Sequence, residues 1–526
     1  MNALISTFRL AVEKSDDDYD LIADQVPVLH FMSMSVFDHA DFDPLFILEA
    51  NFDGPAPIFW GQLCSIFEEE LRAMLRCCKR PLDGDGPLYD AVTEPGSRAP
   101  VAPYFETRTQ APSVFHHGNR GLTRHRILDD EKLFVAMRKA IDVEKGPSPY
   151  RGLEPEVARL RLRKDLISQF PWLDLSAPKR VPLAEGTADV VRLALFAVVL
   201  LCVLSLPGLL LAPFVRWTTY LLVVAGLTAL VAGLLFVKRR GLEGTEVAGG
   251  FPKVVLRPYW LILYAIGIAV YVVIATVLLL FIADAISRLL AALGGAPLWG
   301  EKAPFWSAAR IVGLGLLAAP LSLGLILLRV RYHEKRDSTR ENPALDLERV
   351  AEMGRREDWI AQNHMGSIVL IKPGALRTAI IRAGHLGLGL VLRVTARAGY
   401  LGNMRTVHFA HWAFLNNGSR LLFLSNFDHS WGSYLDDFIE KASKGLTLAW
   451  GSGVGFPPAR FLILDGAAHG RLFKTWALAS RSVSRFWYSA YRDLTVDQIE
   501  RNHRLANGLR ARSLSDDEAS EWMRDL

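Results

Sequence analysis

Long uncharged stretches in the middle of this 526-residue chain divide it into three parts. The stretches cover residues 193–215, 217–237, 258–283 and 311–328. Each has about 18 residues or more, which is enough for a helix rising 1.5 Å per residue to cross the roughly 30 Å hydrocarbon core of a bilayer. The pattern therefore predicts a four-helix transmembrane bundle within residues 190–330, flanked by soluble parts at 1–180 and 345–526.

The soluble part after the membrane region has the clearer pattern of strands and helices. Alternating and short apolar runs predict strands, and runs with a 3.6-residue period predict helices. The predicted strands are 367–372, 406–415, 420–427 and 446–450, and the predicted helices are 375–388 and 431–441. The resulting order, β-α-β-β-α-β, is that of a ferredoxin-like unit. Asn416-Asn417-Gly418 supplies its hairpin turn.

The ends of the soluble parts are less regular. Two more helices are predicted at 468–480 and 495–506, the second ending at Asn507-Gly508. In the first part, strands are predicted at 29–37 and 45–52 and a helix at 59–77. An initial strand is absent unless residues 6–12 supply it, and the Pro- and Gly-rich residues 82–113 predict a long loop.

A sequence repeat relates the two soluble parts. In each copy a His-Phe pair precedes an apolar run that ends in Asn-Phe-Asp, and a Leu-Thr pair with a later Ile follows. The matching residues are His30-Phe31, Asn51-Phe52-Asp53, Leu122-Thr123 and Ile127 in the first copy, and His408-Phe409, Asn426-Phe427-Asp428, Leu494-Thr495 and Ile499 in the second. Blocks in the same order at nearly constant offset predict a duplicated soluble fold whose halves pack together.

Charge and cysteine content restrict the function classes. A net charge of +5 is small for this length, and no basic stripe or motif predicts nucleic-acid binding. The four cysteines include no zinc-type CxxC pair, which is typical of a reduced, cytosolic protein. Lys and Arg gather before the first uncharged stretch, after the second and after the fourth, so the positive-inside rule places both termini in the cytoplasm. We expect a multi-pass protein of the inner (cytoplasmic) membrane that contacts membrane lipids.

Three short segments resemble a largely uncharacterised family of bacterial membrane proteins. They are NFD followed by WGSYLDDFI within residues 421–439, IKPG at 371–374 and YSAY at 488–491. The resemblance covers most of residues 360–510 and, more weakly, 26–140. This family is associated with the dimeric α+β barrel superfamily, which includes dye-decolourising (DyP-type) haem peroxidases and chlorite dismutases. It implies two ferredoxin-like repeats packed sheet to sheet as a dimeric α+β barrel in one chain.

The resemblance also implies haem as a candidate cofactor. DyP-type enzymes carry a GxxDG motif, whose Asp serves peroxide cleavage, and a proximal haem His. Residues 50–54 have Ala50 where the first Gly belongs, and residues 425–429 lack both glycines. The candidate proximal ligands are His408, His411, His429 and His469.

Asp53 and Asp428 each end a predicted strand and precede a predicted helix. Capping of that helix is the favoured interpretation, because a short carboxylate accepts the free N–H groups of a first helical turn. The alternative is a catalytic role as general acid–base carboxylates at a pocket mouth. His30 and His408 hold matching positions, either as a ligand pair or, more commonly, as core histidines bonded to backbone groups. His408 and His411 are three apart on a strand and point to opposite faces, so no shared metal is expected.

Basic and aromatic groups are the remaining candidates. Residues 116–126 contain three His and three Arg, including His117, Arg120 and Arg124, and either bind an anionic headgroup or form a solvated basic loop. Tyr434 belongs to a dense set of Tyr and Trp that serves either ligand stacking or core packing. No phosphate-binding loop, HExxH or GxSxG motif occurs, and no GxGxxG follows a strand.

Two function classes remain. The first is a module that binds or processes an apolar or lipid-derived ligand at the cytoplasmic membrane surface, with Arg120, Arg124, His117 and Tyr434 as candidate ligand-binding residues. The second is a haem-dependent, DyP-like peroxidase or oxidoreductase that acts on membrane-derived substrates. A scaffold for partner enzymes is a weaker third, and homo-oligomer formation is compatible with each. The absence of charges within the predicted spans argues against an ion transporter.

Overall fold

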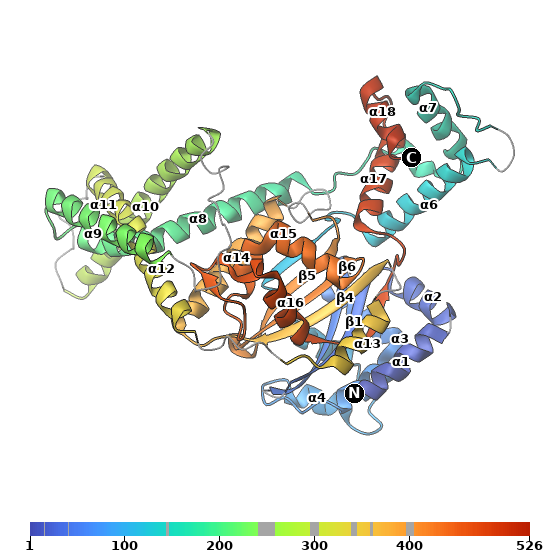
Figure 1. The fold of residues 1–526 in the computed structure, drawn as a ribbon, viewed down its shortest axis with the longest axis horizontal. Coiled ribbons are helices and arrows are strands. Elements are labelled where there is room, and N and C mark those ends of the chain that lie inside the picture. The colour runs from blue at the N-terminus through green and yellow to red at the C-terminus, as the bar shows by residue number, and fades with distance from the viewer. Residues whose placement is uncertain are drawn as a thin grey trace.

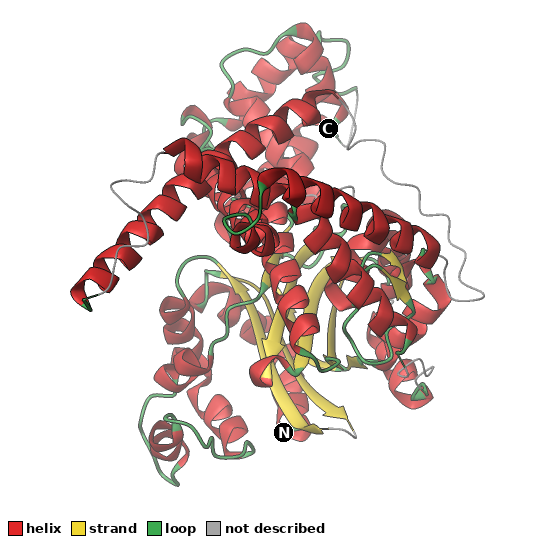
Figure 2. Ribbon diagram, turned by 90° about the vertical axis from the view of Figure 1, so that its left-hand side faces the viewer, coloured by secondary structure: helices red, strands yellow, loops and turns green. Residues whose placement is uncertain are grey.

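The computed structural model describes residues 1–14, 16–39, 42–143, 147–239, 258–294, 305–337, 344–357, 361–395 and 404–526. The described chain has a mixed α+β architecture. Two sheets lie at its centre with helices around them, and a group of long apolar helices extends to one side (Figure 1). Figure 2, which is turned by 90°, shows that the strands are grouped together and that helices make up most of the rest of the chain.

The first soluble part contains three strands among its helices. Its elements are α1 (Asn2–Lys14), α2 (Asp16–Gln25), β1 (Leu29–His39), β2 (Phe42–Phe52), α3 (Ala56–Arg76), α4 (Gly86–Thr93), α5 (Ala102–Arg108), β3 (Val114–His117), α6 (Arg124–Ile141) and α7 (Pro155–Leu166). The strand predicted at residues 6–12 is wrong, because this segment belongs to α1, which buries Ile5 and Phe8 on one helical face. The long loop predicted at 82–113 is also wrong: α4 and α5 each have a proline in the first turn, where the missing N–H costs nothing.

The second soluble part contains most of the strands. Its elements are α13 (Leu347–Glu357), β4 (Gln362–Leu370), α14 (Ala375–Thr395), β5 (Val407–Leu415), β6 (Arg420–Asp428), α15 (Trp431–Trp450), β7 (Ala459–Arg460), β8 (Leu464–Asp465), α16 (Gly470–Ala479), β9 (Arg481–Ser482), β10 (Ser484–Ser489), α17 (Val496–Arg510) and α18 (Asp516–Arg524). The predicted hairpin turn is confirmed, with positive φ at Asn416, Asn417 and Gly418.

Two predictions in this part are wrong. Residues 446–450 form the end of α15 and not a strand, since Leu446, Ala449 and Trp450 are buried at helical spacing beyond a kink at Ala442. Helix α17 does not stop at Asn507-Gly508 but continues to Arg510. Gly508 suits the helix interior because a Cβ there would lie 2.2 Å from the Trp522 ring of α18.

Each central sheet takes strands from both soluble parts. The orders are β10-β1-β2 in one sheet and β3-β5-β6-β4-β9 in the other. Thus β3 of the first part pairs with β5, and β10 of the second part pairs with β1, both antiparallel. Phe37 of one sheet packs with Ile368, Leu422 and Leu424 of the other. The two parts are therefore interlocked and cannot separate without breaking strand pairs.

A second core joins the helices that follow the edge strands. Leu133, Leu162, Leu505 and Trp522 are buried together among α6, α7, α17 and α18. These four helices form the lobe at the top right of Figure 1. The lobe holds the starts of α6 and α17 beside the sheets, which matters for the site.

The apolar helices are α8 (Leu183–Leu211), α9 (Trp217–Lys238), α10 (Pro258–Ala292), α11 (Phe305–Leu317) and α12 (Ala319–Lys335). By length and composition, five described segments could cross a membrane: α8, α9, Ala265–Ala292 of α10, α11 with α12 as one unit, and α14. Most of their apolar side chains are exposed, which indicates a multi-pass membrane protein. The basic loop residues expected at 240–257 lie outside the described residues.

Helix α14 is the candidate span that the sequence did not predict. It runs between β4 and β5, which both pair with β6. Its buried His385 is hydrogen-bonded to Ser113 Oγ (3.0 Å) and to the Ala449 carbonyl oxygen (3.1 Å). Gly387 of α14 lies against the Phe196 ring of α8, so these two helices pack together.

Candidate functional site

The repeated His and Asp residues form the same arrangement twice, and the rings of both His30 and His408 lie near Tyr491. In each case a strand His contacts the Asp at the end of the neighbouring strand. The second carboxylate oxygen of that Asp accepts a hydrogen bond from the first backbone N–H of a distant helix. Asp53 accepts from Arg124 N of α6 (2.8 Å), and Asp428 accepts from Val496 N of α17 (2.9 Å).

The capping interpretation is thus correct in chemistry and wrong about the helix. The helices that directly follow the two Asp residues do not use them: α3 starts after Pro55 without a side-chain cap, and α15 is capped by Ser430. The Asp residues instead hold helices that begin about 70 residues further on, after the edge strands β3 and β10. An Asp beside a helix N-terminus is favoured there by the helix dipole.

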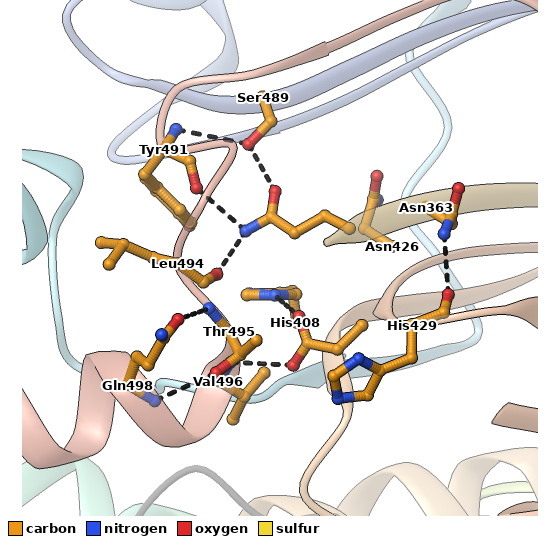
Figure 3. A network of polar contacts seen from close by, with 12 residues as sticks. Asn363, His408, Asn426, His429, Ser489, Tyr491, Leu494, Thr495, Val496 and Gln498 are labelled. Atoms are coloured by element: carbon orange, nitrogen blue, oxygen red, sulfur yellow. Dashed lines mark hydrogen bonds and ion pairs between the residues drawn. The ribbon is translucent and has the colours of Figure 1, made fainter. Parts of the chain in front are cut away.

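In the second copy the His–Asp pair is sealed, that is, buried away from solvent. His408 Nε2 lies 2.7 Å from Asp428 Oδ1, and both side chains are 1% exposed. Figure 3 shows His408 near Val496, Thr495 and Gln498 at the start of α17. Thr495 and Gln498 form a capping box on this helix, which begins where the sequence predicted a helix start. His408 Nδ1 is buried and has no hydrogen-bond partner.

In the first copy the His–Asp pair is open, that is, its Asp is partly exposed to solvent. Asp53 Oδ1 lies 3.1 Å from His30 Nε2, and the Asp53 side chain is 29% exposed while His30 is 1% exposed. The contact at His30 Nε2 falls short of a hydrogen bond, so this pair is looser than its counterpart. The other ring nitrogen, His30 Nδ1, is hydrogen-bonded to Tyr491 Oη (2.8 Å). Burial raises the pKa of Tyr491 well above its ordinary value, so the phenol is neutral.

Asp53 faces a cavity of about 470 Å³ that both soluble parts and the foot of α8 enclose. The lining of the cavity combines apolar and aromatic residues with polar ones. The apolar residues include Phe52, Phe115, Val181, Leu392 and Phe409, and the polar ones include Asp53, His117, Arg120, Arg180, Glu185 and Arg393. A half-apolar cavity with a few convergent polar groups is the usual form of a small-molecule site.

The charges around the cavity are nearly balanced. Arg120 binds Glu185 and Asp189 of α8, and it donates to the Arg393 carbonyl oxygen (2.6 Å). Arg180 forms a two-pronged ion pair with Glu500 (2.6 and 2.8 Å). Arg393 is 48% exposed, and its guanidinium lies 3.7 Å from Asp189. The arginines therefore tie α8 to both soluble parts, and Arg393 retains the most capacity for a ligand.

The histidines of β3 are neutral. Burial lowers the pKa of His116 to about 4 and that of His117 well below its ordinary value. His117 Nε2 is buried without a hydrogen-bond partner, and its ring stacks on Phe409 with centroids 4.4 Å apart. His117 thus joins the aromatic side of the cavity and is not a cationic anchor.

A separate polar network lies between the sheets around Glu49, which is 5% exposed. The repeated Asn51 and Asn426 both donate to Glu49 Oε1 (2.8 and 2.9 Å). His364 Nε2 lies 2.7 Å from Glu49 Oε2, and His411 Nε2 lies 3.3 Å from Oε1. Burial would raise the pKa of Glu49, but the two histidines outweigh it and hold this pKa well below its ordinary value. The network joins β2 to β4, β5 and β6, and is distinct from the cavity.

The structure separates the remaining predicted site residues. Arg124 is buried with its guanidinium on the Val26 carbonyl oxygen, and only its backbone N–H reaches Asp53. Tyr434 is a core residue that donates to Ser425 Oγ (2.9 Å). His429 is exposed with φ of 66°, and His469 precedes α16. Of the side chains predicted as catalytic, cofactor-binding or ligand-binding, only Asp53, Arg120 and His117 line the cavity.

None of the four histidines proposed as haem ligands lines the cavity. His408 and His411 have their Nε2 atoms on Asp428 and on Asn51 (2.5 Å). His429 and His469 lie away from the cavity, whose His residues are His30, His116 and His117. No group of three or more His, Cys, Asp and Glu residues within the described segments could hold a metal ion.

Several residues of the site were not identified from sequence. Tyr491 was noted only as one aromatic among many, and Glu49, His364, Arg180 and Glu185 were not singled out. The repeat contained a signal for Tyr491, since it lies three residues before Leu494-Thr495, where the first copy has Asn119. Asn119 bonds Glu500 and the Val496 carbonyl oxygen and makes no hydrogen bond to His408.

Comparisons with known proteins provide no relative for this chain: no protein-family model, no curated protein and no solved structure matches it.

Proposed function

We propose that this protein is a membrane-anchored module that binds an amphiphilic, lipid-derived ligand at the cytoplasmic surface of the inner membrane. The observation that carries the proposal is the cavity of about 470 Å³ at the foot of α8. Its wall combines aromatic rings with Asp53, Arg120 and Arg393, which suits a ligand with an apolar portion and a polar end.

The position of the cavity supports a ligand drawn from the bilayer. Glu185 lines the cavity on the first turn of α8, and the uncharged part of this helix begins at residue 193. Eight residues of helix span about 12 Å, so the cavity lies close to the membrane surface. Leu392 and Arg393, at the end of the apolar helix α14, complete the wall on the same side.

The interlocked sheets support a four-span topology. Because β3 pairs with β5 and β10 with β1, the two soluble parts lie on the same side of the membrane, which requires an even number of spans between them. The four spans α8, α9, α10 and α11–α12 meet this requirement. Helix α14 cannot be a fifth, because β4 and β5 at its two ends belong to one sheet. Basic residues then favour the cytoplasm for both termini.

The fold proposal is a duplicated α+β barrel. The order β5-β6-β4-β9, with α14 and α15 as the connecting helices, matches a ferredoxin-like unit. The pairs His30 and His408, Asp53 and Asp428, and Thr123 and Thr495 occupy equivalent places in two copies, and β3 and β10 add to the sheet of the opposite copy. In the first copy α1 contacts β10 and α3 much as α14 contacts β3 and α15, and among the described residues no strand pairs with β2 on the side where β4 pairs with β6.

Lipid retention tests the binding proposal. The full-length protein is purified in detergent with exhaustive detergent exchange, and bound lipids are identified by mass spectrometry. Val181→Trp places a large side chain in the cavity, whereas Val190→Trp changes a 48% exposed position on α8 and is the matched control. We expect one tightly held lipid species in wild type and V190W and its loss in V181W. Equal retention in V181W and wild type would refute the proposal.

A haem-dependent peroxidase activity remains the alternative proposal from the sequence resemblance. Its four candidate ligands lie outside the cavity on which the binding proposal rests. An absorption spectrum of protein expressed with ample haem decides: a stoichiometric Soret band would favour the alternative, and a colourless, folded protein would eliminate it.

A further inference from the structure

We propose that Tyr491, His30 and Asp53 form a proton-accepting relay at the cavity, and that the matching His408 and Asp428 serve only as structure. The relay makes the cavity a site of acid–base catalysis on an O–H group of the bound ligand or of a water molecule beside it. This inference rests on the proposed binding function, because it assigns chemistry to the same cavity.

The two copies provide an internal comparison within one chain. Both Asp residues have the same duty toward a helix, since each accepts a backbone N–H at 2.8–2.9 Å. Helix attachment therefore explains why both copies keep an Asp. It does not explain why Asp53 is 29% exposed at a cavity while Asp428 is 1% exposed and sealed.

The copies also differ behind the histidine. His30 Nδ1 has Tyr491 Oη at 2.8 Å, whereas His408 Nδ1 is buried without a partner. A phenol can donate to a bare ring nitrogen and can accept from a protonated one. Thus His30 keeps a partner in both protonation states, while a proton on His408 Nδ1 would be a buried, unsatisfied donor. We therefore place the proton-accepting group in the first copy, where both ring nitrogens of the histidine face polar atoms.

In the relay the transferred proton lies between Asp53 Oδ1 and His30 Nε2. In the relay Tyr491 Oη donates to Nδ1, so Nε2 of the neutral ring carries the N–H and lies 3.1 Å from Asp53 Oδ1, while the partly exposed carboxylate also lines the cavity. In the proposed step, an O–H bond of ligand or water breaks, and its electron pair stays on that oxygen. The proton goes to the Asp53–His30 pair and returns to the same oxygen when the O–H bond forms again. Asp53 is the catalytic residue, and His30 and Tyr491 position and stabilise it.

The groups around the relay come from several elements. Arg124 of α6 and His117 of β3 lie near the relay. In addition to burial, the Asp428 carboxylate raises the pKa of Tyr491. His117 is neutral, and the charged side chains Arg120, Arg180, Glu185 and Arg393 line the same cavity as Asp53. No cation directly pairs with Asp53 among the contacts of the described residues, which leaves the carboxylate available as a base.

An amphiphilic epoxide probes this chemistry without knowledge of the natural ligand. The full-length protein in nanodiscs is treated with 1,2-epoxydecane, and esters are mapped by peptide mass spectrometry over a range of pH. A carboxylate oxygen attacks a ring carbon, the ring C–O bond breaks, and the ring oxygen takes a proton from water. We expect an ester on Asp53 and none on Asp428. Tyr491→Phe should slow labelling of Asp53 about tenfold and alter its pH profile, as expected from loss of one buried hydrogen bond.

His408→Gln is the matched control, because it removes the equivalent histidine of the sealed copy and should leave labelling of Asp53 unchanged. Asp53→Asn must abolish the ester at this position. Labelling of Asp428 at the rate of Asp53, or an unchanged rate and pH profile in Y491F, would overturn the relay. Lipid retention in the V181W test separates the two proposals: retention that depends on the cavity with no epoxide labelling of Asp53 refutes the relay alone.

Discussion

Replacing each repeated Asp by Asn should destabilise the protein unequally. Asp428 accepts from Val496 N and contacts His408 Nε2 at 2.7 Å, with both side chains 1% exposed. In Asp428→Asn the amide oxygen can still accept from Val496 N, but the amide N–H₂ then faces the imidazole. Hydrogen bonds to charged groups contribute about 1.5–3 kcal/mol, and a buried unsatisfied group costs about 1–3 kcal/mol. We therefore expect a loss of about 3 kcal/mol.

Asp53→Asn should cost about 1 kcal/mol, because the substituted side-chain amide can turn into the cavity and keep the bond from Arg124 N. A difference of about 2 kcal/mol corresponds to roughly 2 °C in melting temperature for a chain of this length. The assay is thermal unfolding in detergent by tryptophan fluorescence at one fixed heating rate. Asp43→Asn, which breaks an exposed pair with Lys79, is the control and should not change the melting temperature. If D53N melts as low as D428N, the distinction between an open and a sealed copy is wrong.

Three further substitutions test other parts of the structure. Burial would raise the pKa of Glu49, but His364 and His411 hold this pKa well below 4.5. The stabilising effect of the Glu49 carboxylate is therefore present above pH 4.5 and is lost as the pH falls. Glu49→Gln should flatten the acid side of a profile of melting temperature against pH. Gly121 and Gly54 both have φ near +80°, but a Cβ at Gly121 would lie 2.0 Å from a backbone oxygen, whereas a Cβ at Gly54 would contact no atom. Gly54→Ala should therefore cost only the backbone strain, about 1 kcal/mol. Gly121→Ala should destabilise the protein far more, because it adds a steric clash. Tyr434→Phe should cost about 1 kcal/mol and leave lipid retention unchanged, since its hydroxyl bonds Ser425 in the core; reduced retention would return Tyr434 to the site.

Sequence periodicity predicted the central elements well, because their burial is regular. The predicted strands 29–37, 45–52, 406–415 and 420–427 correspond to β1, β2, β5 and β6, and the four uncharged stretches correspond to apolar helices. Failures occurred where tertiary packing overrides local pattern. Residues 446–450 resemble a strand because they form a short apolar run, and they are the buried end of a kinked helix. Helix α14 was predicted as a helix, but its apolar length was underestimated.

The site could be predicted only in part, because it depends on contacts between segments hundreds of residues apart. The repeat singled out His30, Asp53, His408 and Asp428, and a carboxylate at a pocket mouth was the alternative to helix capping for both Asp residues. It could not indicate which copy is open, since exposure depends on how α8 and α14 pack over the sheets. Nor could it pair Tyr491 with His30, which are 461 residues apart. An alignment of the two copies around Thr123 and Thr495 would have placed Tyr491 opposite Asn119 and marked the asymmetry.

The most direct test of the binding proposal is to locate the ligand by photo-cross-linking. A fatty acid and a phospholipid, each carrying a diazirine near the end of an acyl chain, are incorporated with the full-length protein in nanodiscs, irradiated and mapped by peptide mass spectrometry. A lipid-derived ligand in the cavity predicts cross-links to the peptides that contain Phe115, Leu392 or Phe409, and their loss in V181W but not in V190W. Cross-links confined to α8–α12, unchanged by V181W, would contradict it.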